Sequence, residues 1–342
     1  MKRLPVFLLT CAAALGVGAA CAQSYPHKPI SLIVPFPVSG PQEIFGTARA
    51  SKLFALAASH SPPALTDVLA RSVAQSLTAL GQPVVLDRMP RGDGTYGTIA
   101  AARARPDGYT LLFGASTAMV INPRYAPKRS RELAQDFAPV AMVATMPYAL
   151  LVHPSLPVQD LGELVAYARR RPGLINFASS GDRSTGHLAG ELLNQLADIQ
   201  LVHVAFNGGL NALSGVQTGQ VQVGFVPLSL LLPNLADGKV NALGVTAARR
   251  FPAFPDLPTL SESGLPGFEA EAWYGVFAPA GTPRTAVETV NAALGQTLET
   301  PAMNALLIGY GVEPATGTPE QFAQRIRDDL AKWSGLLKGT VE

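Results

Sequence analysis

The chain has 342 residues, which is enough for two domains of ordinary size. Hydrophobic residues make up 48% of it and charged residues 15%, a composition that supports a full apolar core and excludes global disorder. The formal net charge of +2 argues against nucleic acid as a partner, because that binding usually needs clustered lysine and arginine.

The N-terminal segment has the features of an export signal. A positively charged start precedes a charge-free apolar run, which ends in the small-residue pattern Ala20-Cys21-Ala22. We therefore predict a signal peptide at 1–22 and a periplasmic mature protein, with a lipoprotein anchored at Cys21 as the alternative. Since Cys11 and Cys21 are the two cysteines of the chain, cleavage is expected to leave a protein without disulfides.

Downstream of this signal, short apolar runs alternate with amphipathic segments, an order typical of an α/β protein with largely parallel strands. The pattern predicts strands at 30–36, 83–87, 109–114, 174–179, 201–206, 221–226 and 240–247. It predicts helices at 66–81, 159–173, 186–197, 209–220, 228–238 and 318–333. A proline-rich connector, 249–273, leads to the terminal helices. The predicted fold class is therefore α/β.

Capping residues mark two of the helix starts. Asp160 and Glu163 stand at capping-box spacing. Thr318 is followed by Pro319 at the first helical position and by Gln321 three residues after the cap. We expect a helix to begin at each of these positions.

Several predicted strands end in small polar or glycine residues immediately before a helix. The stretches are "PFPVSG", "FGASTA", "FASSGDRSTG" and "AFNGG". In open α/β sheets, ligands lie beyond the carboxyl ends of the strands, where the N–H groups at helix starts favour a carboxylate or phosphate. Each stretch alone would be an ordinary cap or turn, but together they predict an anion site.

Catalytic and metal-binding patterns are weak. The five histidines, at 27, 60, 153, 187 and 203, show no tight metal-ligand spacing. The stretch "SSGDRSTGH" offers hydroxyl groups near a histidine, but Asp182 replaces the first glycine of a nucleophile elbow. The glycine-containing turns match neither nucleotide-binding pattern. We predict no catalytic residues, no metal and no cofactor, and the chain is interpreted as an exported binding protein.

Several ordered phrases make the chain similar to one receptor family. They include "YPHKPI", "VPFP", "LGQPVVLD", "RPDGYTLLFG", "GHLAGELL", "VHVAF" and "GLPGFEAEAWYGVFAPAGTP". With them the chain resembles the substrate-binding proteins of tripartite tricarboxylate transporters, the TctC or Bug family of extracytoplasmic solute receptors. The resemblance implies a two-domain periplasmic-binding-protein fold, type II-like, with a ligand cleft between the domains.

The resemblance also implies how the domains divide the chain. Domain 1 would comprise 23–123 and 246–342, and domain 2 would comprise 124–245. The chain is expected to cross between them near 122–125 and near 244–247. Closure of the cleft would then capture a small organic acid.

The same resemblance implies which residues grip the carboxylate of the ligand, partly through water. In domain 1 they are Pro35, Phe36, Ser39, Gly40, Asp67, Ser116 and Thr117. In domain 2 they are Ser179, Ser180, Gly181, Ser184, Thr185, Ala205, Phe206, Asn207 and Gly208. Phe206 and Asn207 stand where the family often has tyrosine and lysine. A ligand with one carboxylate, or with an uncharged distal end, is therefore also considered.

Residues 42–65 interrupt the first strand–helix turn. Without them the chain would read "PFPVSGPTDVLARS", close to the family pattern P-F-x-x-G-G-x-x-D, whose last residue corresponds to Asp67. A helix over 42–59 could be a lid over the cleft or an extra surface helix, and the third alternative is a disruption that abolishes binding. Because loop insertions cost little entropy, the fold is expected to tolerate this one.

The predicted function is a periplasmic receptor that captures a small carboxylic acid for a tripartite membrane permease or a sensor. It is expected to be a monomer. The first alternative is a family member whose ligand binding has been altered or lost through the insertion and which acts as a sensor or interaction protein. The second is a hydrolase that uses Ser184 and His187.

Overall fold

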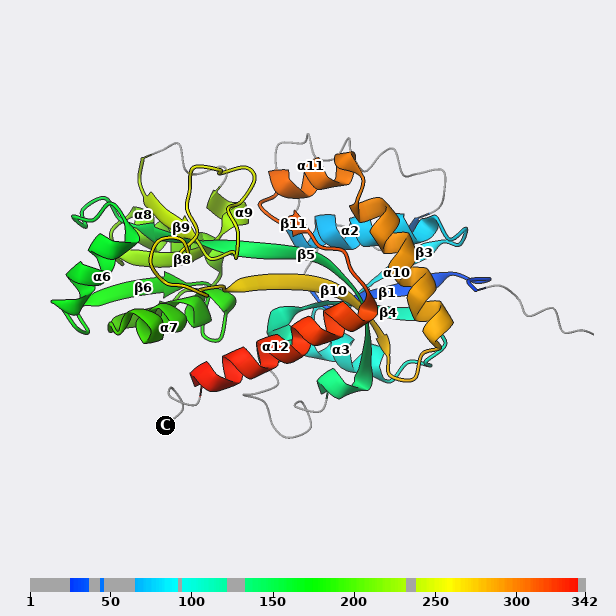
Figure 1. Cartoon of the computed structure of the whole chain (residues 1–342). Coiled ribbons are helices and arrows are strands. Elements are labelled where there is room, and N and C mark those ends of the chain that lie inside the picture. The colour runs from blue at the N-terminus through cyan, green and yellow to red at the C-terminus, as the bar shows by residue number, and fades with distance from the viewer. Residues whose placement is uncertain are drawn as a thin grey trace, which may run out of the picture.

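The structure is a computed structural model that describes residues 25–36, 44–45, 65–91, 94–121, 133–231 and 238–337. These residues form a mixed α/β protein with one eleven-stranded sheet and helices along both of its sides (Figure 1). The strands are β1 (Ile30–Val34), β2 (Ile44–Phe45), β3 (Val84–Arg88), β4 (Thr110–Ala115), β5 (Phe137–Val152), β6 (Ile175–Ser179), β7 (Leu201–Ala205), β8 (Val223–Pro227), β9 (Asn241–Val245), β10 (Glu271–Pro279) and β11 (Glu313–Pro314). The helices are α2 (Leu65–Thr78), α3 (Thr95–Ala102), the π-helix η2 (Thr117–Ile121), the 3-10 helix η3 (Leu133–Asp136), α6 (Leu161–Arg169), α7 (Thr185–Ala197), α8 (Gly209–Gln217), α9 (Leu228–Leu231), α10 (Arg284–Leu298), α11 (Pro301–Gly309) and α12 (Pro319–Leu337).

The first part of the sheet is built around β1. This strand pairs in parallel with β3 and β4, so that Leu32 lies level with Leu86 and Leu111. The side chains of β1 and β4 are largely buried and apolar, as expected for parallel strands that are covered on both faces. β10 pairs with β4 in the antiparallel direction, and the run of parallel pairs ends there.

Strand β5 joins the two parts of the sheet. Its residues 137–147 pair with β10, whereas residues 148–152 pair with β8 and β9. β6 then pairs in parallel with both β8 and β7. Figure 1 shows β5 and β10 as the long strands that run between the two groups of elements. The predicted domain boundaries remain predictions, and the expected crossing at 122–125 lies outside the described residues.

The apolar core extends through both parts of the sheet. Its larger cluster contains the fully buried Phe113 of β4, Trp273 of β10 and Phe177 of β6. Phe225 and Val226 are neighbours in β8 but belong to different clusters, because successive side chains of a strand point to opposite faces. The apolar core therefore fixes the positions of the strand ends.

Both predicted helix starts are confirmed, and the box at Thr318 is fully reciprocal. Asp160 Oδ1 accepts the N–H of Glu163 at 2.8 Å, and Glu163 Oε2 accepts the N–H of Gln159 at 2.8 Å. Thr318 Oγ1 accepts the N–H of Gln321 at 3.2 Å, and Gln321 Oε1 accepts the N–H of Thr318 at 2.9 Å. The sequence therefore located these helix starts correctly.

The described residues 44–45 of the insertion form a strand rather than a helix. Residues 44–45 form β2, which pairs antiparallel with β3, so the prediction of a helix over 42–59 is wrong for these two residues. Isoleucine and phenylalanine favour strands, and the edge of β3 supplies a partner. Residues 46–64 lie outside the described part of the chain.

Strands β5 and β10 are missing from the strands predicted by sequence. The segment 137–152 is a long apolar run with little alternation, and its buried side chains occur on both faces of the strand. Apolar periodicity cannot separate a strand from a buried helix in such a run. The two strands that join the halves of the molecule are therefore a finding of the structure.

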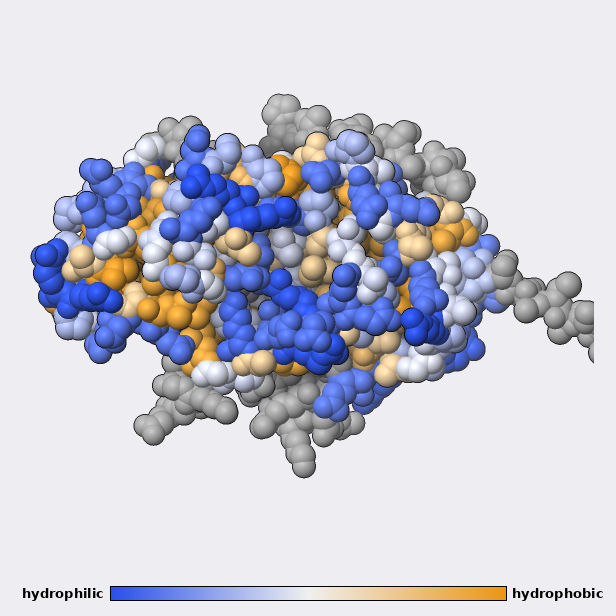
Figure 2. Space-filling view, viewed as in Figure 1, coloured by the Kyte–Doolittle hydropathy of each residue, from blue (hydrophilic) through white to orange (hydrophobic). Residues whose placement is uncertain are grey.

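The surface is mostly polar. Hydrophilic residues cover most of the face shown in Figure 2, with apolar residues in separate patches. Among the helices that the structure describes, none has both the length and the apolar character needed to cross a membrane.

Candidate functional site

Residues 179–185 form a polar turn between β6 and α7, which we call the α7 turn. Ser179 Oγ donates to the carbonyl oxygen of Gly181 at 2.9 Å and accepts from Ser184 Oγ at 3.1 Å. Ser184 also accepts the N–H of His187 at 3.2 Å. An N-cap serine satisfies an N–H group that has no partner within the helix, which explains why α7 begins at Thr185. Hydroxyl and helix N–H groups thus gather at this end of α7.

A second turn, 205–208, follows β7, and we call it the β7 turn. The N–H of Phe206 donates to the carbonyl oxygen of Ser179 at 3.1 Å, and the N–H of Gly208 donates to that of Ser180 at 3.2 Å. Gly208 has a φ of 93°, which glycine adopts without strain. The structure therefore brings the two predicted domain 2 segments together and joins them by backbone hydrogen bonds.

The ring of Phe206 packs against α8. A Cβ atom placed on Gly215 would lie 2.5 Å from the ring tip, Cζ, so the ring requires glycine at this position of α8. That the missing tyrosine hydroxyl changes the ligand stays a prediction. Asn207 is exposed, and its carbonyl oxygen accepts from Asn211 Nδ2 at 2.7 Å.

On the domain 1 side, Pro35 and Phe36 follow β1. The N-cap of α3 approaches closely, because a Cβ atom on Gly94 would lie 2.6 Å from the carbonyl oxygen of Pro35. The ring of Phe36 meets Phe113 and Tyr274 edge-on, with centroid distances of 6.0 and 6.4 Å. Phe36 therefore links the end of β1 to β4 and β10.

Asp67 is buried in the first turn of α2 and pairs with two arginines. Its Oδ2 lies 3.0 Å from Arg71 Nε, and its Oδ1 lies 3.6 Å from Arg88 Nη2. The guanidinium nitrogens of Arg88 are buried and have no hydrogen-bond partner among the residues that the structure describes. Arg88 thus places a cation with unused donors at the end of β3. The predicted residues Ser39 and Gly40 lie outside the described residues.

Ser116 and Thr117 lie where β4 ends and η2 begins. Ser116 is buried, and its Oγ accepts the N–H of Trp273 at 3.2 Å. This hydroxyl therefore ties the end of β4 to β10. Thr117 is partly exposed and is the member of the pair with a side chain open to solvent.

Two buried tyrosines, which the sequence did not single out, connect the two sides. Tyr274 of β10 contacts Phe36, and Tyr148 of β5 lies beside the start of α7, where a Cβ atom on Gly186 would be 3.3 Å from its ring. Burial raises the pKa of Tyr148 above its usual range and the pKa of Tyr274 to about 12, so both are neutral phenols. No local pattern marks them, because their surroundings come from segments that are distant in the sequence.

A cluster of two histidines and one aspartate lies at the α7 turn. The rings of His187 and His203 are stacked, with centroids 3.8 Å apart and an angle of 6° between their planes. His203 Nδ1 lies 3.5 Å from Asp182 Oδ1, and its Nε2 lies 2.7 Å from Ser179 Oγ. Burial and the neighbouring His187 lower the pKa of His203 to about 4, so this imidazole is neutral at pH 7.

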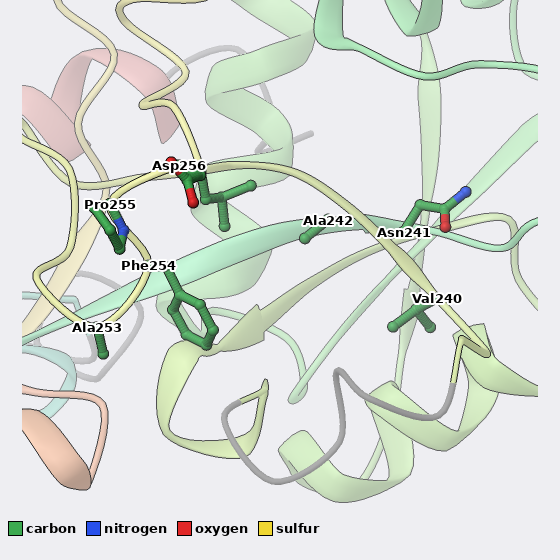
Figure 3. A pocket seen from close by; sticks show the side chains of 8 residues that line it. Val240, Asn241, Ala242, Ala253, Phe254, Pro255 and Asp256 are labelled. Carbon is green, nitrogen blue, oxygen red and sulfur yellow. The ribbon is translucent and has the colours of Figure 1, made fainter.

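A cavity of about 490 Å³ lies apart from both turns (Figure 3). The start of β9 and the segment 253–257 line it with the side chains of Val240, Asn241, Ala242, Ala253, Phe254, Pro255, Asp256 and Leu257. None of the predicted site residues lines this cavity.

The chain is similar to known proteins along most of its length. The profile of the family described as "Tripartite tricarboxylate transporter family receptor" matches residues 69–340. Protein BugT of Bordetella pertussis is 30% identical, over 99% of this chain and 98% of that protein. Rpa4515 of R. palustris, solved with adipate, has 31% identity and a TM-score of 0.71, over 92% of this chain and 97% of that chain. MatC (Rpa3494) of Rhodopseudomonas palustris, solved with bound malate, has 30% identity and a TM-score of 0.68, over 92% and 100% of the two chains.

These structures confirm the predicted two-domain periplasmic-binding-protein fold. The long similarity also explains why short phrases scattered along the sequence were sufficient to predict the architecture.

Proposed function

The chain belongs to the tripartite tricarboxylate transporter receptor family, and on that premise we propose that it captures a small carboxylic acid between the α7 turn and the end of β1. The family consists of periplasmic solute receptors and not of enzymes, which removes the hydrolase alternative. Rpa4515 and MatC were solved with adipate and malate, both carboxylates, and this supports a carboxylate for the present chain as well.

The observation that carries the proposal is the junction of the α7 and β7 turns at the N-terminus of α7. Helix N-termini carry partial positive charge and N–H groups without helical partners, which favour a carboxylate. The hydroxyl groups of Ser179 and Ser184 donate within the α7 turn and fix its shape, and the backbone bonds to the β7 turn hold the α7 turn in position. A site whose donors are already positioned loses less entropy on binding.

Residues near the end of β1 supply a positive charge and partly exposed side chains for contact with the ligand. Arg88 carries a buried positive charge beside Asp67, and its guanidinium donors have no hydrogen-bond partner among the described residues, which favours an anion near the end of β1. Phe36 and Thr117 are the partly exposed predicted contacts on this side. We propose that Asp67 and Ser116 act by positioning Arg88 and β10, while Ser39 and Gly40 remain proposed contacts on the basis of sequence.

The proposed partner is a tripartite membrane permease, with a sensor as the alternative, and the proposed receptor is a monomer. The signal peptide at 1–22 remains part of the proposal. Whether the chain is a working receptor or a family member with altered binding depends on the effect of the insertion at 42–65. We favour the working receptor, because the α7 and β7 turns are joined by backbone hydrogen bonds and the described residues 44–45 of the insertion pair with β3, away from these turns.

A thermal-shift panel tests the proposal. The purified protein is screened against short mono- and dicarboxylates, acidic amino acids and aromatic acids, beside a variant that lacks 42–65. A ligand at a hundredfold excess over its Kd should stabilise the fold by about 2.7 kcal/mol, which gives a clear rise in Tm.

The outcome separates the alternatives. Stabilisation of both proteins by a carboxylate supports the receptor and a neutral insertion. Stabilisation of the shortened variant alone assigns loss of binding to the insertion. If no acid stabilises either protein, the receptor proposal is wrong.

A further inference from the structure

We propose that Asp182, His187 and His203 bind a divalent transition-metal ion of the zinc class. One ligand atom from each residue lies within 4.8 Å of the other two. Two imidazoles and one carboxylate are a donor set that Zn²⁺ accepts, with a fourth position left for water. The three residues come from the α7 turn, from α7 and from β7. Spacing along the sequence predicted no metal site because the fold supplies this proximity.

Two of the ligand atoms already stand at a suitable distance. His203 Nδ1 lies 3.5 Å from Asp182 Oδ1. Two ligands bound tetrahedrally at about 2.1 Å from one ion are about 3.4 Å apart. An ion can therefore bind between these two atoms with little movement of either residue.

The surroundings of His203 suit a metal ligand. Its Nε2 lies 2.7 Å from Ser179 Oγ, and Ser179 Oγ donates to the carbonyl oxygen of Gly181 at 2.9 Å. When His203 donates its Nε2–H to Ser179, the lone pair of Nδ1 is free for the ion. Metal-binding histidines almost always donate their second N–H in this way, and the bond fixes the orientation of the ring.

His187 must move more than the other two residues. Its Nδ1 accepts the N–H of Arg183 at 3.0 Å, and its Nε2 lies 3.7 Å from Glu191 Oε1. Metal binding through Nδ1 replaces the bond from Arg183 and separates the two stacked rings, while Glu191 retains the N–H on Nε2. The move is short, since the ligand atoms of the cluster already lie within 4.8 Å.

The site is accessible to ions. The side chain of Asp182 is 73% exposed, whereas that of His203 is 11% exposed. The imidazole of His203 is therefore largely buried, whereas the carboxylate of Asp182 is open to solvent. This proposal does not depend on the identity of the organic ligand.

Zinc binding is measured on the full chain without an affinity tag, with Cys11 and Cys21 replaced by serine in every variant. ZnCl2 is titrated at pH 7 against a chromogenic chelator. We expect one ion per chain, an affinity about tenfold lower in Asp182→Asn, and one about a hundredfold lower in His203→Ala. The control is His153→Ala, because His153 pairs with Ser155 outside the cluster and its loss should leave the affinity unchanged.

Asp182→Asn keeps the test valid if His203→Ala fails to fold, because Asp182 is exposed and the change preserves its shape. Visible absorption of bound Co²⁺ gives a second measurement, and its d–d bands should disappear in both cluster variants. Equal zinc affinity in the wild type and Asp182→Asn, or no binding by the wild type, would overturn the proposal.

Discussion

Ser184 Oγ accepts the N–H of His187 and donates to Ser179 Oγ, so one hydroxyl both starts α7 and holds the α7 turn. The family resemblance predicted Ser184 as a ligand contact, whereas its role as the N-cap of α7 was not predicted. Tyr148 and Tyr274 were not predicted, since their role arises only from the pairing of strands far apart in the chain. At the scale of residues, sequence therefore located the polar turns but not the aromatic contacts between them.

The Ser184→Ala variant should lose the N-cap hydrogen bond of α7 and the hydrogen bond to Ser179 within the α7 turn. We expect a loss of about 1 kcal/mol in the free energy of unfolding and about tenfold weaker carboxylate binding. Thr300→Ala is the matched control, because Thr300 Oγ1 accepts the N–H of Met303 as the cap of α11. It should cost similar stability and leave binding unchanged. Urea unfolding and calorimetry measure the two effects, and equal binding by both variants would contradict the role of Ser184.

Glu271 makes stability depend on pH. It lies opposite Pro147, where β10 pairs with β5, and burial together with the nearby Glu269 raises its pKa to about 7. The folded state therefore binds a proton more tightly than the unfolded state, so stability falls as pH rises from about 4.5 through 7.

In Glu271→Gln this fall should be absent. The wild type should lose about 2 kcal/mol or less between pH 5 and pH 8 relative to the variant. Urea midpoints at both pH values give the comparison. Parallel pH curves for the two proteins would show that Glu271 does not titrate in this range.

At the scale of elements, the contact between α7 and β8 sets the position of the α7 turn. A Cβ atom on Gly186 would lie 2.7 Å from the carbonyl oxygen of Phe225, which belongs to the backbone of β8 and cannot easily move. Helix α7 can therefore approach the sheet only with glycine at this position. The sequence predicted the helix but not this contact, because the packing depends on β8.

The Gly186→Ala variant should displace the start of α7. We expect a destabilisation of about 1–3 kcal/mol and weaker carboxylate binding. Gly295→Ala in α10 is the control, because a Cβ atom there has no atom of the structure within 4 Å. It should raise the free energy of unfolding by about 0.5–1 kcal/mol, since alanine favours a helix over glycine. A tolerated Gly186→Ala would contradict the close packing of α7 on β8.

At the scale of the whole molecule, the α7 and β7 turns and the end of β1 belong to two parts of one sheet that share β5. Alternating strands and helices, together with the family resemblance, were sufficient to predict the two-domain fold. The long strands β5 and β10 were not predictable by periodicity, because long buried runs give the same pattern in strands and helices. The way in which β5 and β10 join the two parts of the sheet is therefore known only from the structure.

The most direct test of carboxylate capture is calorimetry with the tightest-binding acid from the panel and with its methyl ester, which removes the charge and adds one methyl group. We predict that the acid binds one to one and the ester about a hundredfold more weakly, because charge-assisted hydrogen bonds contribute about 1.5–3 kcal/mol each. Equal affinity for the acid and the ester would contradict the proposal that this receptor recognises its ligand by a carboxylate.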